Sequence, residues 1–502
     1  MDGDAIEAAL RVLGEVRDLA VDDPVRQRFQ RAVDGLVKDA QKQRRADRRR
    51  RTAALDRAVV AGASTGAVDR AEGVPVVGGS DEGSGTTRRE RRCYACRGRF
   101  RMVDAFYHAL CPECAGLHRR YRDARTDLTG RRALVTGGRV KIGFQVALKL
   151  LRDGAEVMVV TRFPADAGRR FEGEPDAAAW LPRLRIIGAD LRDPRQVLEV
   201  ADRAGEHRLD ILINNAAQTV RRPAWAYQPL VATELLTARA AGAGRSGEVA
   251  PRAEAGGSVE VARTTGADGS AAAARAAAEG RPVDAARAGV TGPAVEMVSG
   301  YRPGVAELML PAITSATGRA GVDGATTAWD ETDATGALVV PGEHNSWTAR
   351  LGEVDPVELL EVQLVNVIAP FLLLDRLRPA LTGPGVDRRY VVNVTGREGW
   401  FGGGTGPERH PHTSMSKAAL NMLTRVAAPD LARDGVHMCG VDTGWITDEN
   451  PPGRRDRRAA AGWRPPLDVV DAAARVYHPI LSGEAGAPLH GVLVKNYGVV
   501  PW

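Results

Sequence analysis

The feature that most constrains the fold is a repeated alternation of short apolar runs with helical patterns. Between Thr126 and Tyr227 the runs are ALVTG, EVMVV, LRIIGAD and LDILINNAA, and segments with helical periodicity separate them. The alternation resumes at Val354, with a long apolar helix pattern, the run YVVNVT, a helix around Lys417, the run VHMCGVD and the run GVLVKNY. Strands that alternate with helices form a parallel sheet with right-handed crossovers. We therefore predict an α/β fold with a doubly wound parallel sheet.

The first part of the chain has a different character. The whole chain, with 502 residues, is longer than one ordinary domain. Residues 1–60 show helical periodicity, with a second helix expected to begin at Asp23-Pro24, and residues 41–51 (QKQRRADRRRR) are strongly basic. We interpret the basic run as a solvated helix face, with a nucleic-acid or acidic-partner patch as the alternative. Residues 61–90 are rich in Gly, Ser, Thr and Asp, which predicts a flexible linker.

The α/β pattern is interrupted by an insertion over residues 228–350. From Gln228 to Gly300 there is no Phe, Trp, Tyr or His, and Ala, Gly, Arg and Thr dominate. Such a segment cannot bury enough apolar surface to offset the entropy lost on ordering. We predict that residues 228–300 are largely disordered or loosely helical. Residues 301–350 regain aromatic side chains, and we expect them to return to the fold near the mouth of its site.

Four of the five cysteines form two CxxC pairs, Cys93, Cys96, Cys111 and Cys114. Two such pairs at this separation can supply four thiolates tetrahedrally to one Zn²⁺. Gly98 and Pro112 suit the tight turns that this geometry needs. We predict a structural zinc module over residues 91–125, and reduced or redox-active thiol pairs are the alternative.

The location and the partners are predicted from composition. No run of 18 or more apolar residues is present, and the N-terminal sequence MDGDAIEAALRVLGEV lacks the pattern of a signal peptide. We therefore expect a cytoplasmic protein without a membrane partner. The net charge of +6 is small for this length, so nucleic acid is not an expected partner.

The segment ALVTGGRVKIGFQVALKLLRDGAEVMVVTRFP predicts a strand, a glycine-rich turn, a helix and a second strand. Gly137 and Gly143 flank the turn at the spacing that brings backbone N–H groups onto a pyrophosphate. The region resembles the short-chain dehydrogenase/reductase family, whose turn has the pattern TGxxxGxG. Thr136, Gly137 and Gly143 match this pattern, and Lys141 replaces the middle glycine. We expect a wider loop path at Lys141, with its amine near phosphate.

Further motifs of this family follow in order. Asp190-Leu191 resembles the pair that contacts adenine, Asn214–Ala217 resembles NNAG, and Asn366 resembles the proton-relay asparagine. Lys417 lies in SKAALNM, which resembles the active-site lysine helix, and Asp442–Thr447 resembles the PGxxxT stretch that holds the nicotinamide. The resemblance covers about residues 128–230 and 350–502 and implies a Rossmann-type NAD(P)-binding domain over 128–502. The coenzyme-binding residues that it implies are Thr136, Gly137, Gly138, Arg139, Lys141, Ile142, Gly143, Arg162, Asp190, Leu191, Asn214, Ala216, Lys417, Gly444, Ile446 and Thr447.

The end of the second strand indicates the coenzyme. NAD sites place an acid there on the ribose 2′-hydroxyl, but this chain has Thr161-Arg162 and no acid before Asp166. Arg139 adds a second guanidinium, and arginine pairs with phosphate in a bidentate manner. We therefore favour NADP(H), with NAD(H) as the alternative.

The family's catalytic pattern is incomplete. Its carbonyl reductases use Ser, Tyr and Lys, with the tyrosine four residues before the lysine. That position holds Thr413, and the serine position holds Gly396 beside Thr395. A tyrosine pKa near 10 can be lowered by a lysine charge, whereas a threonine hydroxyl is a much weaker acid.

Two interpretations follow from this departure. In the first, the chain transfers hydride and another group handles the proton, because histidine titrates near neutral pH. His344 and Tyr301 are further candidates in the insertion, and the catalytic residues that we predict are Lys417, Asn366, Thr413, His412 and His410. In the second, the domain binds NADP(H) without catalysis, as a regulator or scaffold. A zinc-bearing adaptor for nucleic acid or protein is a third class. The resemblance also implies a small-molecule substrate and a homo-oligomer.

Overall fold

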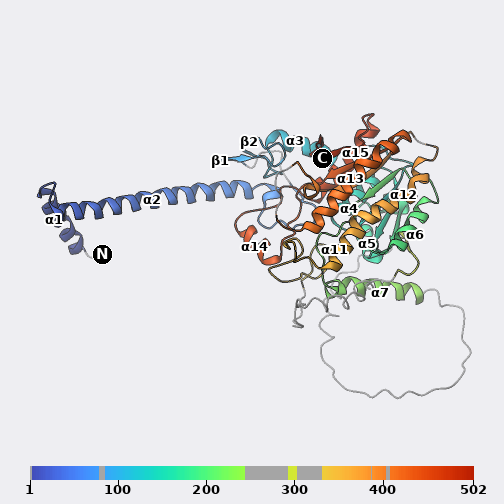
Figure 1. Ribbon diagram of the computed structural model, residues 1–502, viewed down its shortest axis with the longest axis horizontal. Coiled ribbons are helices and arrows are strands. Elements are labelled where there is room, and N and C mark those ends of the chain that lie inside the picture. The colour runs from blue at the N-terminus through green and yellow to red at the C-terminus, as the bar shows by residue number, and fades with distance from the viewer. Residues whose placement is uncertain (1–2, 79–84, 244–291, 302–330, 386, 403–407) are drawn as a thin grey trace, which may run out of the picture. The chain divides into compact units, whose positions relative to one another are not determined.

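The computed structural model describes residues 3–78, 85–243, 292–301, 331–385, 387–402 and 408–502 (Figure 1). The chain divides into two compact units, one of residues 1–70 and 77–116 and the other of residues 71–76 and 117–502. Most of the segment predicted to be disordered, residues 244–291, lies outside the described residues.

The first unit begins with two helices, α1 (Gly3–Asp18) and α2 (Pro24–Ala61). Asp23 caps α2, because its carboxylate accepts the backbone N–H groups of Val25 and Arg26. Pro24 suits the first helical position, where the N–H would have no helical partner. The predicted helix start is confirmed. Within α2, which is described throughout, Val60 alone is buried, so the basic run lies on a solvated helix.

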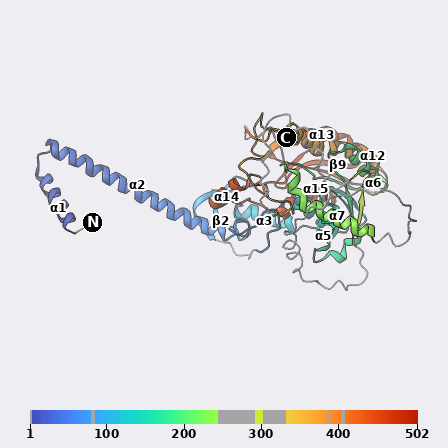
Figure 2. The same ribbon diagram turned by 90° about the horizontal axis from the view of Figure 1, so that it is seen from below.

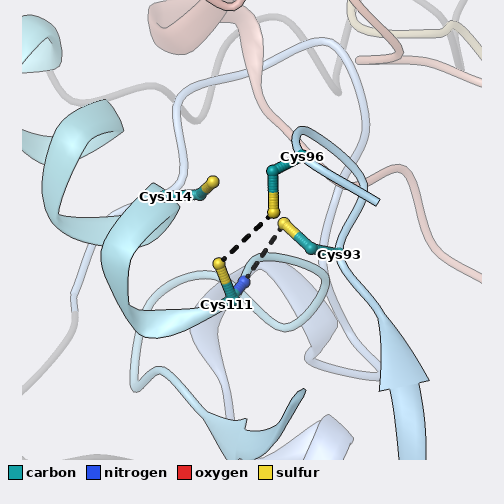
Figure 3. Close-up of side chains that lie close together, drawn as sticks. All are labelled: Cys93, Cys96, Cys111 and Cys114. Carbon is teal, nitrogen blue, oxygen red and sulfur yellow. Dashed lines mark hydrogen bonds between the residues drawn. The ribbon is translucent and has the colours of Figure 1, made fainter. Parts of the chain in front are cut away.

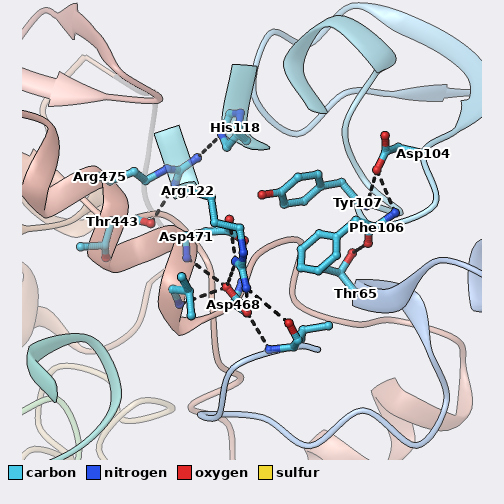
Figure 4. Close-up of polar contacts among 12 residues, drawn as sticks. Thr65, Asp104, Phe106, Tyr107, His118, Arg122, Thr443, Asp468, Asp471 and Arg475 are labelled. Atoms are coloured by element: carbon cyan, nitrogen blue, oxygen red, sulfur yellow. Dashed lines mark hydrogen bonds and ion pairs between the residues drawn. The ribbon is translucent and has the colours of Figure 1, made fainter. Parts of the chain in front are cut away.

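The rest of the first unit is built around an antiparallel hairpin of β1 (Gly85–Arg92) and β2 (Arg99–Val103). The turn η1 (Ser64–Gly66) joins this part, since the Thr65 hydroxyl donates to the carbonyl oxygen of Phe106 at 2.8 Å (Figure 4). Helix α3 (Pro112–Asp123) begins in this unit. Residues 61–66 and 85–90 therefore belong to ordered structure, and the predicted linker over 61–90 is wrong at both ends.

The second unit is centred on a nine-stranded sheet of order β11-β10-β9-β8-β6-β3-β4-β5-β7. Neighbouring strands are parallel except for the β10–β11 hairpin. The strand order reverses between β3 and β6, and ligands of such sheets bind beyond the carboxyl ends of the strands at that point. The strands are β3 (Arg132–Thr136), β4 (Glu156–Thr161), β5 (Leu184–Gly188), β6 (Ile211–Asn214), β7 (Ala294–Met297), β8 (Arg389–Thr395), β9 (Val436–Asp442), β10 (Leu493–Lys495) and β11 (Gly498–Val500).

Helices cover both faces of this sheet (Figure 2). Val135 and Val159 pack with α4 (Lys141–Arg152), α5 (Pro164–Glu172) and α15 (Val469–Glu484) on one face. Leu134 and Met158 pack with α6 (Pro194–Gly205), α12 (Ala369–Thr382) and α13 (Pro411–Arg433) on the other. Successive strand residues point to opposite faces, so apolar runs without polar alternation are what a doubly covered sheet requires. The predicted Rossmann-type fold is confirmed.

Smaller elements complete the second unit. They are η2 (Ala177–Ala179), η3 (Leu181–Arg183), η4 (Ala224–Tyr227), α7 (Gln228–Ala243), α11 (Pro356–Gln363), the π-turn η6 (Leu364–Ile368), η7 (Arg397–Gly399) and α14 (Pro452–Ala460). The continuous helix Pro356–Thr382 is long and apolar enough to cross a membrane by length and composition, although half of its most apolar window is buried in the fold. The sequence predicted a long helix here but no membrane-spanning segment, because charged residues interrupt the apolar run.

Two strands of the nine-stranded sheet were not predicted. Strand β7 lies in the segment expected to be disordered, yet it adds to the sheet edge beside β5, where Glu296 pairs with Arg185 at 2.7 Å. Its four residues are mostly exposed, so no apolar run marked them. Strand β11 follows a tight hairpin in which Asn496 and Tyr497 both have positive φ, a backbone shape of two-residue hairpin turns.

Candidate functional site

The turn between β3 and α4 has no room for side chains at two glycines. A Cβ on Gly137 would lie 2.9 Å from Cα of Ala216, and Gly137 itself has φ of +69°. A Cβ on Gly143 would lie 2.9 Å from the carbonyl carbon of Gly137 and closer still to its oxygen and to Nδ2 of Asn215. Only glycine fits both places without displacement, so the first turn of α4 presents bare backbone at the carboxyl end of β3.

The end of β6 fixes this turn. The Thr136 hydroxyl accepts the backbone N–H groups of Asn215 and Ala216 at 3.1 and 3.0 Å. Asn215 in turn donates its side-chain amide to the carbonyl oxygens of Thr136 and Gly137 at 3.1 and 3.2 Å. Asn214 points the other way and donates to Oδ1 of Asn393 at 2.8 Å. The motif at the end of β6 therefore holds the glycine-rich turn in shape.

Lys141 occupies the place of the missing middle glycine with φ of +52°, in the left-handed region. This positive φ is a backbone conformation that glycine adopts freely, and the wider loop path at Lys141 stays a prediction. The Lys141 amine lies 3.3 Å from Oε1 of Glu449 and holds the pKa of that carboxyl below its usual range. Helix α4 has no side-chain cap and no acid in its first turn, so its N-terminus, next to this amine, favours an anion.

The two arginines expected near a 2′-phosphate differ in their surroundings. Arg139 is buried, and its guanidinium pairs with Asp166 at 2.6 Å and donates to the carbonyl oxygen of Thr335 at 2.7 Å. Asp166 also pairs with Arg169 and Arg170, so this one carboxylate faces three guanidiniums. Arg162, directly after β4, is partly exposed and lies over the rings of Phe163 and Tyr227, 5.5 and 5.0 Å from their centroids. Arg162 is the better placed of the two to meet a phosphate.

The predicted adenine end follows β5. Asp190 is buried and forms an ion pair with Arg192 at 2.6 Å, which lowers the pKa of the carboxyl against the opposing effect of its burial. Arg192 also contacts Glu361 of α11 at 3.2 Å. The Asp190 carboxylate thus already has an ion-pair partner within the fold, and Leu191 beside it is buried.

The loop after β9 forms the other end of the site. Gly444 has φ of +78°, and a Cβ there would overlap the guanidinium of Arg475. Arg475 donates to the carbonyl oxygen of Thr443 at 2.8 Å and contacts Nε2 of His118 at 2.8 Å (Figure 4). Ile446 is buried, and the Thr447 hydroxyl donates to Oε1 of Glu449 at 2.7 Å. These contacts hold the Thr443–Thr447 loop beyond the carboxyl end of the sheet.

Helix α15 is itself anchored where this loop meets it. Arg122 pairs with Asp468 at 2.6 Å and with Asp471 at 3.0 Å (Figure 4). Asp468 and Asp471 also form a capping box at the start of α15. Arg122 thereby fixes the start of the helix that carries Arg475.

Lys417 lies on α13, and Asn366 bonds the residue that precedes it, Ser416. The buried Lys417 amine donates to the carbonyl oxygen of Val394 at 2.9 Å, and burial lowers its pKa to about 8. Asn366 lies in the π-turn η6, donates to Oγ of Ser416 at 3.0 Å and accepts the N–H of Gln218 at 2.8 Å. π-turns occur often at functional sites, because they displace a side chain from the regular helix face.

Two threonine hydroxyls lie at the places of the missing side chains, Thr413 at the tyrosine position and Thr395 beside the serine position. Thr395 Oγ1 and Thr413 Oγ1 are buried and have no hydrogen-bond partner among the described residues. Neither hydroxyl ionises near neutral pH, so both can orient a ligand but cannot readily replace a tyrosine acid. Glu398 of η7, which the sequence motifs did not single out, lies next to Gly396.

The predicted histidines face other elements. His410 precedes α13 with φ of +43°, its ring stacks on Trp347 at 4.0 Å between centroids, and burial lowers its pKa to about 4. His412 is buried with Nε2 3.8 Å from Oε1 of Glu358 on α11, and burial lowers its pKa as well. His344 is exposed, and the Tyr301 hydroxyl donates to the carbonyl oxygen of Arg162.

The last described part of the insertion, residues 331–350, contacts the site at several points. Thr335 meets Arg139, Asn345 donates to the carbonyl oxygen of Glu449 at 2.9 Å, and Ser346 accepts the N–H of Arg221 at 3.1 Å. These residues lie beside the glycine-rich turn and the loop after β9, as expected from their aromatic content. Residues 302–330 lie outside the described residues.

The first unit carries the four-cysteine group (Figure 3). The Sγ atoms of Cys93, Cys96, Cys111 and Cys114 all lie within 4.8 Å of one another. Cys93 Sγ accepts the N–H of Cys111 at 3.3 Å, and Cys96 Sγ accepts the N–H of Gly98 at 3.4 Å. Backbone N–H groups that point at sulfur stabilise thiolates. The donor set and its compactness fit a tetrahedral Zn²⁺.

Comparison with known proteins gives a family match over part of the chain. Residues 131–237 match the model of the short chain dehydrogenase family. An uncharacterized protein of Acanthamoeba polyphaga mimivirus is 29% identical over 408 residues, which are 78% of this chain and 71% of that protein. A probable oxidoreductase of Streptomyces antibioticus is 44% identical over 90 residues, 18% of this chain and 30% of its own length. Among solved structures, the Pseudomonas aeruginosa RhlG/NADP active-site complex is 19% identical with a TM-score of 0.41, over 74% of this chain and 95% of that chain.

Proposed function

We propose that this chain, whose second unit has a short-chain dehydrogenase fold, is an oxidoreductase that interconverts a carbonyl compound and an alcohol with NADP(H). The turn at Gly137 and Gly143 carries the proposal, because both glycines pack closely on Asn215 and Ala216 after β6, an arrangement typical of a turn that binds pyrophosphate with backbone N–H groups. Lys417 and Asn366, joined through Ser416, add the polar groups that such a reaction needs.

The residues present fit the coenzyme. The first turn of α4 and the Lys141 amine would bind the pyrophosphate. Asp190-Leu191 would contact the adenine, and the Thr443–Thr447 loop would hold the nicotinamide. Arg162 would meet the 2′-phosphate, and no acid stands at the end of β4 to favour the free 2′-hydroxyl of NAD(H). Bound there, the coenzyme supplies or accepts the hydride.

The protein contributes binding, orientation and proton transfer. Lys417, whose amine donates to the carbonyl oxygen of Val394, would hold the nicotinamide ribose, and its charge would favour an anionic oxygen nearby. Asn366 binds the backbone of Gln218 and the hydroxyl of Ser416, the residue before Lys417, so it would position the helix turn that carries the lysine. Thr413, His410 and His412 stay predictions as proton donors.

The four-cysteine group supports a second proposal, a structural Zn²⁺ in the first unit. Four sulfurs within 4.8 Å of one another would repel as bare thiolates, and a metal ion removes that cost. Metal analysis of the purified full chain by mass spectrometry tests this, and the absence of zinc with reduced, intact cysteines would contradict it.

One further feature supports a homo-oligomer, and a cytoplasmic location stays a prediction. Large apolar side chains on α12 and α13 are exposed, among them Phe371 at 51% and Val426 at 69%. Exposed apolar faces of this size are characteristic of subunit interfaces. Light scattering of the purified chain would show a single monomeric mass if this proposal is wrong.

A catalytically silent coenzyme-binding regulator is the competing function. The loss of the tyrosine and serine, replaced by Thr413 and Gly396, favours it. A zinc-bearing adaptor draws on the exposed basic face of α2, and it would show salt-dependent binding to nucleic acid.

Thermal unfolding in the presence of NADPH and NADH tests the coenzyme claim. A ligand that binds the native state raises the unfolding temperature with its concentration. We expect NADPH to stabilise the chain more than NADH at equal concentration. Stabilisation by neither coenzyme would refute the proposed function.

A further inference from the structure

Gly396, at the place of the family's serine, lies directly against a carboxylate. A Cβ built on Gly396 would overlap Oε2 of Glu398 and would lie 3.6 Å from its Cδ. The Glu398 carboxylate therefore fills the space into which a serine side chain would project. A serine side chain at residue 396 would overlap the Glu398 carboxylate where it now lies. The glycine therefore makes room for the glutamate.

The backbone holds Glu398 firmly in this place. The turn η7 packs on α13 so closely that a Cβ on Gly399 would lie 2.5 Å from the carbonyl carbon of Lys417 and 2.7 Å from the N atom of Ala418. Asn421 donates its side-chain amide to the carbonyl oxygen of Gly399 at 2.9 Å. These contacts fix the backbone of η7 beside the lysine helix, and the Glu398 side chain extends from it to Gly396.

The charges around Glu398 suit a group that exchanges protons. Burial raises the pKa of its carboxyl and Asp442 of β9 raises it further, while Lys417 of α13 and Lys495 of β10 lower it, for a net upward shift. Asp442 is itself paired with Lys495 at 2.6 Å. The side chain is partly exposed, so water can restore its proton.

We propose that Glu398 gives and takes the substrate proton, in place of the family's tyrosine and serine. The inference rests on the proposed function. In the reductive direction the carbonyl carbon gains the hydride that the coenzyme supplies, and the carbonyl oxygen takes the proton from the Glu398 carboxyl. The ketone or aldehyde is reduced to an alcohol, the coenzyme is oxidised, and the carboxylate regains a proton from water. Oxidation of the alcohol runs the same steps in reverse.

The other candidates are less well placed for this step. The Thr413 hydroxyl stands at the tyrosine position but is too weak an acid. His412 faces Glu358 on α11, and His410 is covered by the Trp347 ring. Glu398 contacts the serine position and lies within electrostatic reach of Lys417.

Proton release on coenzyme binding tests the inference without a known substrate. Calorimetric titrations with NADP⁺ and with NADPH, in buffers of different ionisation enthalpy, report the protons exchanged. The positive charge of the oxidised nicotinamide lowers the pKa of a carboxyl beside it, so NADP⁺ should release more protons than NADPH. In Glu398→Gln, which keeps the shape of the side chain, this difference should vanish. Glu199→Gln, outside the site on α6, is the matched control and should keep it.

The outcomes separate the inference from the proposed function. Coenzyme binding with the same proton difference in wild type and Glu398→Gln, or with none in wild type, would overturn the role of Glu398 while leaving the proposed function intact. No coenzyme binding by wild type would overturn both. For any carbonyl compound that wild type reduces, Glu398→Gln should lose about 10²–10⁴-fold in kcat. Unchanged kcat in a folded variant that binds NADPH would refute the inference.

Discussion

Replacing Gly143 by alanine tests the turn between β3 and α4 most sharply. The added Cβ would lie 2.9 Å from the carbonyl carbon of Gly137 and closer to its oxygen, and it would press on the Asn215 amide that holds the turn. Overpacking of this kind costs about 1–3 kcal/mol, and the helix propensity of alanine offsets about 1 kcal/mol of it. For a unit of this size, the net loss of up to about 2 kcal/mol corresponds to a Tm lower by roughly 2–4 °C.

The effect on the coenzyme should exceed the effect on stability. The backbone must move by several tenths of an ångström where the pyrophosphate would lie, and we expect the Kd for NADPH to rise about tenfold or more, a loss of about 1.4 kcal/mol. Gly205→Ala, in α6, is the matched control, since its Cβ would lie 3.5 Å from Cδ2 of Leu377 with no other close neighbour than Ala380 at 4.0 Å. Calorimetric titration with NADPH measures both variants. Equal NADPH affinity in wild type and Gly143→Ala would refute the reasoning.

Three other changes test separate parts of the account. Arg162→Gln should weaken NADPH by about 10–100-fold, the loss of charge-assisted hydrogen bonds of about 1.5–3 kcal/mol, and leave NADH unaffected; equal losses for both coenzymes in equilibrium titrations would contradict the 2′-phosphate assignment. NADPH affinity of wild type should fall as pH rises through the Lys417 pKa of about 8, because the lysine loses its charge. Lys417→Met should not show this fall in affinity with pH. A fall that persists in the variant would belong to another group. Cys111→Ser should abolish zinc binding and lower the unfolding temperature of the first unit, whereas a variant that retains zinc by mass spectrometry would show that the cysteine is not a ligand.

The sheet was predictable from the sequence because burial on both faces leaves a clear trace. Runs such as ALVTG and YVVNVT are apolar without alternation, which few other structures require. Strand β7 left no such trace, since it lies at an exposed edge and its pairing depends on contacts with β5 rather than on its own composition.

The site was predictable where backbone space decides the residue. Gly137, Gly143 and the cysteine pairs follow from geometry that only glycine or thiolate satisfies. The role of Arg139 was not predictable, because its partner Asp166 reaches it only through the packing of α5 on the turn. The position of Glu398 was not predictable for the same reason, because it depends on how η7 packs on α13.

The central claim is that this chain transfers hydride, and an isotope measures that directly. The full chain is incubated with NADPH deuterated at the transferable position and a panel of aldehydes, ketones and quinones, and the products are analysed by mass spectrometry. The account predicts an alcohol product that carries deuterium on the former carbonyl carbon. Bound NADPH with no deuterium in any product would contradict it and favour a silent coenzyme-binding regulator.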